Sequence, residues 1–461
     1  MKGNGHSKGN GHLKGNGPSR GNEVARTNGT ARVNGARGER PILQRPARIA
    51  GQAAIVARFG GTLGKRFSRN NLALLGQVHA AYSALRRSRA AIRGRGANIF
   101  TQWVGDPDAL GSAVLLKAIL EELGAKEARI LTGSLAHPQN RNLVVKCEIE
   151  LHDPNAERLP RGLNCMVDTS PPLGTANTVR VVPVKEYFFV ADHHADPEDV
   201  EQNVREKGVR RVKLAFVGLP VGSTSAFMAA LAMAFGLFEK VGPKGRAAAA
   251  LGIYTDTSAL LHGSTPLDFR MFEKLTRDPD TQDLLDELRD YRVPSEWFAY
   301  RNVAFSNMEV TGAVRVAPVG HVKDEHRDVI AEIANDLLRI EGTSIGIAVA
   351  VTQLGTEVSV RADSRLLGAD QARIVRVIDH LLSYAFPGVS GFKYERVPPH
   401  RVEGGACVPH SQAQQHMWSV AAPGPGQDQE ILEHCRASAR ALVAALADLK
   451  FARPDEIQGL L

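Results

Sequence analysis

The chain has 461 residues, of which 43% are hydrophobic, so it can form two or three domains with sizeable cores. It has no apolar run of transmembrane length and no apolar signal core near its start, so we expect neither a membrane-spanning segment nor a secretory signal peptide. The four cysteines show neither the spacing of a metal site nor the density of a disulfide-bonded protein, and we therefore expect a reduced, cytoplasmic location.

Positive charge is concentrated at the start of the chain. Residues 1–97 contain 19 Lys and Arg against two acids, whereas the whole chain contains 57 against 49. The first residues repeat every six positions as KGNGHS, KGNGHL and KGNGPS, and such Gly and Asn density cannot offset the entropy of ordering. We therefore expect a disordered basic arm, which could bind nucleic acid, solubilise the protein or serve as a transit peptide, although it is poor in Ser for the last role.

Residues 71–92 have the apolar spacing of a helix. Leu75, Val78 and Tyr82 fall on one face, and Arg86 and Arg87 lie near its end. Such a helix packs on the domain behind it, and binding to a membrane surface is the weaker alternative.

From residue 97 to residue 257 the pattern alternates between strand and helix, which is typical of a mainly parallel sheet covered on both faces. GDPDALGSA, from Gly105 to Ala113, lies at the first strand-to-helix corner and carries Asp106 and Asp108. Paired carboxylates suit Mg²⁺ or Mn²⁺, although Asp is also a common helix N-cap.

Three further apolar runs end in acids or imidazoles. These are MVDTSP with Asp168, YFFVADHHAD with Asp192, His193 and His194, and ALGIYTDTS with Asp256. We expect four strands to deliver these groups at their C-terminal ends, where open α/β sheets bind ligands.

In these four stretches, and in their order, the chain resembles the DHH family of phosphoesterases from about Asn98 to Ser258. Members of this family include nanoRNases, RecJ-type exonucleases, cyclic dinucleotide phosphodiesterases and family II pyrophosphatases. GSTSAFMAALA, from Gly222, resembles the small-residue helix start between the third and fourth motifs. Its Ser223 and Thr224 could cap a buried helix over 223–235 or offer backbone N–H groups to a phosphate, and capping is favoured.

The resemblance implies two bound Mn²⁺ or Mg²⁺ ions. Asp168 would bridge them and Asp106 would hold the first, whereas the second would be held by Asp108, His193 and Asp256. His194 would face the substrate phosphate, with Asp192 orienting the imidazoles.

The first motif departs from the family pattern at two positions. The family carries a metal-ligating His four residues before its first Asp. This chain has Gln102 at that position, where we expect it to lie next to the metal ligands without binding the metal itself. Gly105 replaces a frequent proline. The first metal site is therefore expected to be the weaker one.

A second, smaller α/β lobe is expected after a helical connector. IGIAVAVT and EVSVRAD flank a short turn and predict an antiparallel hairpin, with helices near 329–340 and 369–385. SVRADSR resembles a family strand whose Arg meets substrate, so Arg361 is either a substrate contact or an ordinary exposed strand residue. PPHRVEGGA resembles a remnant of the family's nucleotide-gripping glycine loop and keeps His400, Gly404 and Gly405.

The expected organisation has six parts. They are a disordered arm (1–45), a basic helical segment (46–96), a DHH-type metal lobe (97–265), a helical connector (266–307), a substrate lobe (308–422) and a C-terminal helix (423–461).

The expected function is hydrolysis of short oligonucleotides or bisphosphonucleotides by two-metal activation of water. The expected partners are this nucleotide substrate, a nucleic acid at the arm and a second copy of the chain in a homodimer, without a membrane. The alternatives are a RecJ-type single-strand exonuclease and a nucleotide-binding or nucleic-acid-binding protein with an impaired metal site.

Overall fold

The computed structural model describes most of the chain between residues 69 and 448. The described residues are 69–135, 137–154, 161–170, 184, 186–194, 209–353, 355–367, 371–386, 393–397, 400–408 and 427–448. The predicted arm (1–45), the beginning of the basic segment, Pro398 and Pro399, and the last residues lie outside them.

Within the described residues, six strands form the first sheet, and every pair of neighbours is parallel. In chain order they are β1 (Gly96–Phe100), β2 (Glu127–Leu131), β3 (Leu151–His152), β4 (Gly162–Val167), β5 (Glu186–Ala191) and β6 (Arg211–Phe216). Their spatial order is β3-β2-β1-β4-β5-β6, so the direction of winding reverses between β1 and β4. The carboxyl edge at such a reversal is where doubly wound sheets bind ligands.

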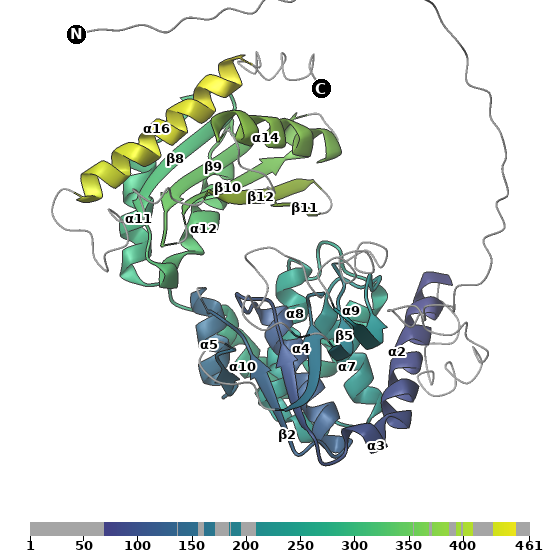
Figure 1. The fold of residues 1–461 in the computed structure, drawn as a ribbon. Helices are drawn as coiled ribbons and strands as arrows, with labels where there is room; N and C mark the ends of the chain where they lie inside the picture. Colours follow the sequence, from purple (N-terminus) through teal and green to yellow (C-terminus); the bar gives the residue numbers. More distant parts are fainter. Residues whose placement is uncertain are drawn as a thin grey trace, which may run out of the picture. The chain divides into compact units, whose positions relative to one another are not determined.

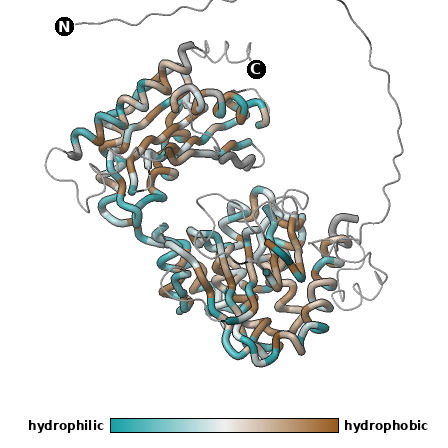
Figure 2. The backbone as a smooth tube through the Cα atoms, in the orientation of Figure 1, coloured by the Kyte–Doolittle hydropathy of each residue, from teal (hydrophilic) through white to brown (hydrophobic). Residues whose placement is uncertain are grey.

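Both faces of this sheet are apolar. Ile99, Cys165 and Phe189 belong to one buried cluster, whereas their neighbours Phe100 and Met166 belong to another. The alternation follows from the two-residue repeat of a strand, and Figure 2 shows the resulting brown segments through this lobe. The expected α/β architecture with a mainly parallel sheet is confirmed.

Helices of the first lobe pack around the larger cluster (Figure 1). They are α2 (Arg69–Arg87), α3 (Arg89–Ile92), α4 (Pro107–Glu122), α5 (Pro138–Lys146), α7 (Thr224–Ala234), α8 (Phe238–Asp256), α9 (Pro266–Leu275) and α10 (Pro279–Arg289). Leu75, Val78 and Tyr82 of α2 are buried in that cluster, which confirms that this helix packs on the lobe. α9 and α10, from the predicted connector, pack against α8.

One predicted strand is a helix. The run ALGIYTDTS belongs to α8, and Asp256 is the last residue of that helix. A fully buried helix and a fully buried strand are both apolar on every side, so periodicity could not separate them. Two strands, β4 and β5, therefore end directly before predicted groups, whereas Asp106 and Asp108 lie at the start of α4 and Asp256 ends α8.

A second sheet of six strands is described further along the chain, in the order β11-β12-β10-β9-β8-β7. Its strands are β7 (Glu309–Thr311), β8 (Val314–His321), β9 (Ile345–Val351), β10 (Thr356–Asp363), β11 (Lys393–Val397) and β12 (Arg401–Val408). β9 and β10 form the predicted antiparallel hairpin, and β8 pairs with β9 in parallel.

Helices that precede, separate and follow these strands in the sequence pack on the second sheet. These helices are α11 (Ser295–Ser306), α12 (Val329–Leu338), α14 (Gln371–Ala385) and α16 (Gln427–Asp448). The chain also forms the 3₁₀ turn η1 (Asp324–His326) and the short helix α13 (Ser364–Leu367). α16 runs along β8 (Figure 1), burying Ile431, Cys435, Ala439 and Leu442, so the predicted C-terminal helix packs on this sheet. No helix in the described ranges is long and apolar enough to cross a membrane.

The predicted glycine loop is not a loop after residue 400. Gly404 and Gly405 lie within β12, between β10 and β11, and pair there with Val360 and Ser359. A Cβ on Gly405 would lie 2.4 Å from the Val358 carbonyl oxygen, so this glycine permits close strand pairing. Backbone groups engaged in a ladder are not free to grip a phosphate.

Candidate metal centre

Two acids continue the ladder of the first sheet beyond its strands. The N–H of Asp168 donates to Ala191 O at 2.8 Å, and the N–H of Asp192 donates to Phe216 O at 2.9 Å. Asp168 has φ of +58°, a left-handed conformation that Asp tolerates better than most residues. Both carboxylates therefore start from rigid backbone at the carboxyl edge of the sheet.

The structure brings four predicted residues together. One ligating atom from each of Asp168, His193, His194 and Asp256 lies within 4.8 Å of the others. His193 Nε2 is 3.2 Å from Asp256 Oδ2 and 3.6 Å from Asp168 Oδ1. Asp108 adjoins this group, since its Oδ2 is 3.8 Å from His193 Nε2. We call Asp108, Asp168, His193, His194 and Asp256 the acidic cluster.

Asp108 is held by the beginning of α7. Its two carboxylate oxygens accept the N–H groups of Thr224 and Ser225, each at 2.7 Å, and its side chain is fully buried. The Thr224 hydroxyl donates to Asp168 Oδ1 at 2.9 Å. Ser223 caps the same helix by accepting the N–H of Ala226. The predicted capping role of Ser223 is confirmed. Of the Ser223 and Thr224 N–H groups considered for a phosphate, that of Thr224 binds Asp108.

His194 is oriented by Asp192. Asp192 Oδ1 lies 3.1 Å from His194 Nδ1 and accepts the His194 N–H at 3.0 Å. Its Oδ2 accepts a hydrogen bond from the Ser170 hydroxyl at 2.6 Å. The Asp192 carboxylate is buried, whereas the His194 side chain is 41% exposed, so His194 marks the open side of the cluster.

Asp256 reaches the cluster from the C-terminal end of α8. The negative end of a helix dipole disfavours a carboxylate there, so helix stability does not account for this residue. Gly252 lies one turn earlier, where a Cβ would be 2.8 Å from Asp108 Cα and 2.9 Å from Pro107 O. The missing side chain therefore lets α8 touch the backbone of the first motif.

Asp106 and Gln102 interact with each other at the end of β1. Asp106 caps α4 by accepting the N–H of Ala109, and the Gln102 side-chain amide donates to its other oxygen. An amide nitrogen is not a metal ligand, so this pair offers a cation fewer donors than the second predicted site. Gly105 packs closely on Thr132, whose Oγ1 would lie 2.7 Å from an added Cβ.

Burial and crowding of like charge perturb these groups. Burial raises the pKa of Asp106 to about 6 and that of Asp256 to about 7, and the charge of Asp108 adds to both. Burial also raises the pKa of Asp168 well above its usual range. Burial lowers the pKa of His193, but the carboxylates of Asp256 and Asp108 outweigh this and raise it to about 9. Carboxylates this close repel one another unless a cation or proton intervenes.

Two buried polar atoms in the cluster test whether a metal fits. Among the described residues, Asp168 Oδ2 is buried without a hydrogen-bond partner, and His193 Nε2 is buried with Asp256 Oδ2 as an ion-pair neighbour at 3.2 Å but without a well-formed hydrogen bond. Buried polar groups are nearly always satisfied, and a cation between these two atoms would satisfy both. Carboxylate oxygens with one imidazole nitrogen suit Mn²⁺ or Mg²⁺. The cluster can therefore hold a divalent cation.

The substrate residues predicted in the second lobe have other partners or neighbours. Arg361 Nε donates to Asn335 Oδ1 at 3.1 Å, and its Nη2 lies 3.3 Å from Glu403 Oε2. His400 accepts the Ser364 N–H at its carbonyl, in the turn before β12. Their contact with substrate stays a prediction.

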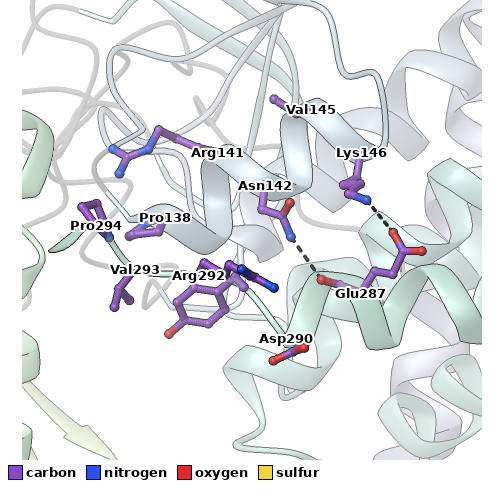
Figure 3. Close-up of a pocket in the computed structure, with 11 residues that line it drawn as sticks. Pro138, Arg141, Asn142, Val145, Lys146, Glu287, Asp290, Arg292, Val293 and Pro294 are labelled. Atoms are coloured by element: carbon purple, nitrogen blue, oxygen red, sulfur yellow. Dashed lines mark hydrogen bonds and ion pairs between the residues drawn. The ribbon is translucent and has the colours of Figure 1, made fainter.

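A pocket of about 690 Å³ lies between α5 and the end of α10 (Figure 3). Figure 3 shows Lys146 directed at Glu287, 2.6 Å apart, and Asn142 donating to the Glu287 carbonyl oxygen. None of the predicted site residues lines this pocket. The acidic cluster remains the candidate site.

Three residues that bind the acidic cluster or its neighbour Asp192 were not assigned that role from the sequence. Ser170 binds Asp192, Thr224 binds both Asp108 and Asp168, and Ser225 binds Asp108. Ser170 follows Asp168 by two residues, so its position in the motif was an available signal. Nothing in the local sequence pairs Thr224 with Asp108, 116 residues away.

Comparison with solved structures places this architecture among known ones. An exopolyphosphatase-related protein from Bacteroides fragilis matches with a TM-score of 0.50 and 14% identity, over 79% of this chain and 97% of that chain. The chain shares the fold of that protein. Two weaker matches, with TM-scores of 0.34 and 0.26, are a DHH domain from a member of a ribosomal-protein family and exonuclease RecJ bound to manganese. Identities there are 13% and 14%, with 82% and 78% of this chain and 92% and 94% of those chains covered.

Comparison with curated proteins finds a distant relative. An uncharacterized protein of Methanocaldococcus jannaschii is 24% identical over 285 residues, which are 60% of this chain and 54% of that protein. The chain thus spans about half the length of this curated relative, and no family model matches it. These comparisons therefore show the fold of the chain and leave its activity to be proposed.

Proposed function

We propose that the chain is a metal-dependent phosphoesterase that hydrolyses short oligonucleotides or bisphosphonucleotides. The observation that carries the proposal is the convergence of Asp168, His193 and Asp256, with the buried and unsatisfied Asp168 Oδ2, at the carboxyl edge where the sheet reverses. A divalent cation bound there would supply a Lewis acid that activates water and neutralises a phosphoryl group. The DHH fold supports the same class of chemistry.

Buried and exposed residues of the site would have different roles. Asp108 and Asp168 are buried and would hold the cation. His194, on the open side, would face a phosphate oxygen. Burial lowers the pKa of His194, but its hydrogen bond with Asp192 and the charges of Asp192 and Asp256 together outweigh burial and raise this pKa. An imidazolium there would donate to the phosphate and offset its charge.

A substrate panel tests the proposal. The protein would be incubated with Mn²⁺, or with EDTA as the control, and with a dinucleotide, a longer single strand, adenosine bisphosphate, a cyclic dinucleotide, pyrophosphate and polyphosphate. We expect the dinucleotide or adenosine bisphosphate to be hydrolysed fastest, and only with metal. Metal binding without turnover of any of these would favour the nucleotide-binding alternative.

A RecJ-type exonuclease is the second candidate, because residues 1–97 carry 19 Lys and Arg against two acids. Deleting residues 1–40 should weaken binding to long single strands and flatten its salt dependence, yet leave dinucleotide turnover nearly unchanged. Salt titrations of binding would measure this. The control replaces the repeat cations by Gln at constant length; the replaced residues are Lys2, Lys8, Lys14, Arg20, Arg26 and Arg32. An unchanged salt slope in both variants would make the arm a solubilising tail.

Gln102 should make one metal site weak. The natural protein is expected to bind Mn²⁺ in two phases, one tight and one weak, because Gln102 donates to Asp106 where the family has an imidazole ligand. Gln102→His should raise the Mn²⁺ affinity of the weak site in calorimetric titration. Gln282→His, on the exposed face of α10, adds the same imidazole elsewhere and should leave the Mn²⁺ affinity of both sites unchanged. Two equally tight phases in the natural protein would contradict this assignment.

A further inference from the structure

The beginning of α7 positions two acids of the cluster at once. The N–H groups of Thr224 and Ser225 bind Asp108, and the Thr224 hydroxyl binds Asp168. A small shift of this helix end would therefore move both carboxylates or leave them without donors. The geometry of the cluster depends on whatever fixes the loop that enters α7.

Asp268, on α9, binds that loop. Its Oδ2 accepts the Gly222 N–H at 2.9 Å, and its Oδ1 accepts the Ser223 hydroxyl at 3.2 Å. The same Oδ2 accepts the N–H of Thr265 at 2.8 Å and its hydroxyl at 2.6 Å. One buried carboxylate thus joins the start of α9 to the start of α7, 45 residues away for Ser223.

Helix capping alone does not account for the hydrogen bonds of Asp268 to the Gly222–Ser223 loop. Thr265 and Asp268 form a capping box for α9, which needs only those two residues. The bonds to Gly222 and Ser223 are additional, and Gly222 has no space for a side chain. A Cβ there would lie 2.7 Å from Thr257 Cγ2, 2.9 Å from Gly263 O and 3.1 Å from Asp268 Oδ2. Thr257 follows Asp256, so this junction also borders the segment that carries the Asp256 ligand.

We propose that Asp268 is a positioning residue for the acidic cluster. By tying the Gly222–Ser223 loop to α9, it holds the α7 N–H pair against Asp108 and the Thr224 hydroxyl against Asp168. The inference rests on the proposed function, since the cluster is taken to bind a divalent cation. Asp268 itself touches neither the cation nor the substrate.

The test compares Mn²⁺ affinity, measured by calorimetry, among substitutions of two capping acids. Asp268→Ala should bind Mn²⁺ about 10- to 100-fold more weakly, the loss typical of removing support for a ligand. Asp268→Asn should stay within about threefold of the natural protein, because its carbonyl can accept from Gly222 and Thr265 while its amide donates to Ser223.

Asp278 provides the matched control. It caps α10 and accepts hydrogen bonds from Thr281 and Arg246, without contact to the α7 loop. Asp278→Ala should lower the thermal midpoint, because it removes the α10 cap and the ion-pair partner of buried Arg246, yet leave Mn²⁺ affinity unchanged. The kinetic readout is kcat against KM for the best substrate of the panel, where Asp268→Ala should chiefly lower kcat at subsaturating metal.

Each possible outcome supports or overturns the positioning role of Asp268. Natural Mn²⁺ affinity in folded Asp268→Ala, or equal weakening in Asp278→Ala, overturns the positioning role. If Asp268→Ala does not fold, Ser223→Ala removes the Ser223 bond to Asp268 together with the α7 cap. It should weaken Mn²⁺ affinity about two- to threefold, and unchanged affinity there overturns the proposal. A natural protein that binds Mn²⁺ but hydrolyses nothing removes the proposed function alone, because the affinity comparison still stands. A natural protein that binds no Mn²⁺ overturns both.

Discussion

Asp168→Asn is expected to abolish Mn²⁺ binding at the acidic cluster and to lower phosphoester hydrolysis by at least about a thousandfold, with the fold retained. Asp168 Oδ2 is buried without a partner among the described residues, and its Oδ1 is 3.6 Å from His193 Nε2. Asn keeps the shape, tolerates the φ of +58° and can still accept from Thr224. The variant therefore removes the charge and little else.

Without metal, Asp168→Asn should be at least as stable as the natural protein, although it loses Mn²⁺ binding and activity. Burial raises the pKa of Asp168, and the charges of Asp108, Asp106 and Asp256 raise it further, so a neutral side chain relieves repulsion. In EDTA, the thermal midpoint of Asp168→Asn should equal or exceed that of the natural protein. Added Mn²⁺ should raise only the natural midpoint, because a ligand stabilises the state that binds it.

Asp328→Asn is the control for this variant. Burial raises the pKa of Asp328 to about 6, but this acid precedes α12 and belongs to no part of the cluster. It should leave the response of the midpoint to Mn²⁺ intact. Wild-type turnover in Asp168→Asn would remove the hypothesis of metal-dependent hydrolysis altogether.

Gly252→Ala should disrupt the site through the backbone. The added Cβ would lie 2.6 Å from Ser225 Oγ, 2.8 Å from Asp108 Cα and 2.9 Å from Pro107 O. Two of these atoms are backbone and cannot rotate away, so α8 must withdraw and take Asp256 with it. We expect a loss of about 3 kcal/mol of unfolding free energy and a severe loss of Mn²⁺ affinity, measured by denaturant unfolding and calorimetry.

Gly245→Ala is the matched change in the same helix. Its Cβ would meet Val241 Cγ1 at 2.4 Å and Val114 Cγ1 at 3.2 Å, which are side-chain methyl groups and not backbone of the first motif. Because Val is stiff at χ1, helix propensity of about 1 kcal/mol offsets only part of this clash, so Gly245→Ala should also lose stability, yet Mn²⁺ affinity should be unchanged. Equal effects of the two substitutions would mean that Gly252 serves helix packing in general.

Local sequence was sufficient to predict the parts of the centre that depend on neighbours in the chain. Asp168 and the Asp192–His194 segment follow apolar strands directly, and both lie at strand ends. The β9–β10 hairpin, the helices beside it and the capping by Ser223 also depend on residues a few positions apart. The roles of the predicted ligands remain predictions, because a cation and not the chain alone would define them.

Features of the site that depend on residues far apart in the sequence became visible only in the tertiary structure. The sequence could not place β4 beside β1, and that pairing sets the reversal where the acids meet. It could not show that Asp256 ends a helix, because a buried helix and a buried strand are equally apolar. The bonds from Thr224 to Asp108 and from Gly222 to Asp268 join residues far apart in the sequence. Such contacts exist only once the core has packed, since no local propensity selects which buried donor meets which buried acceptor.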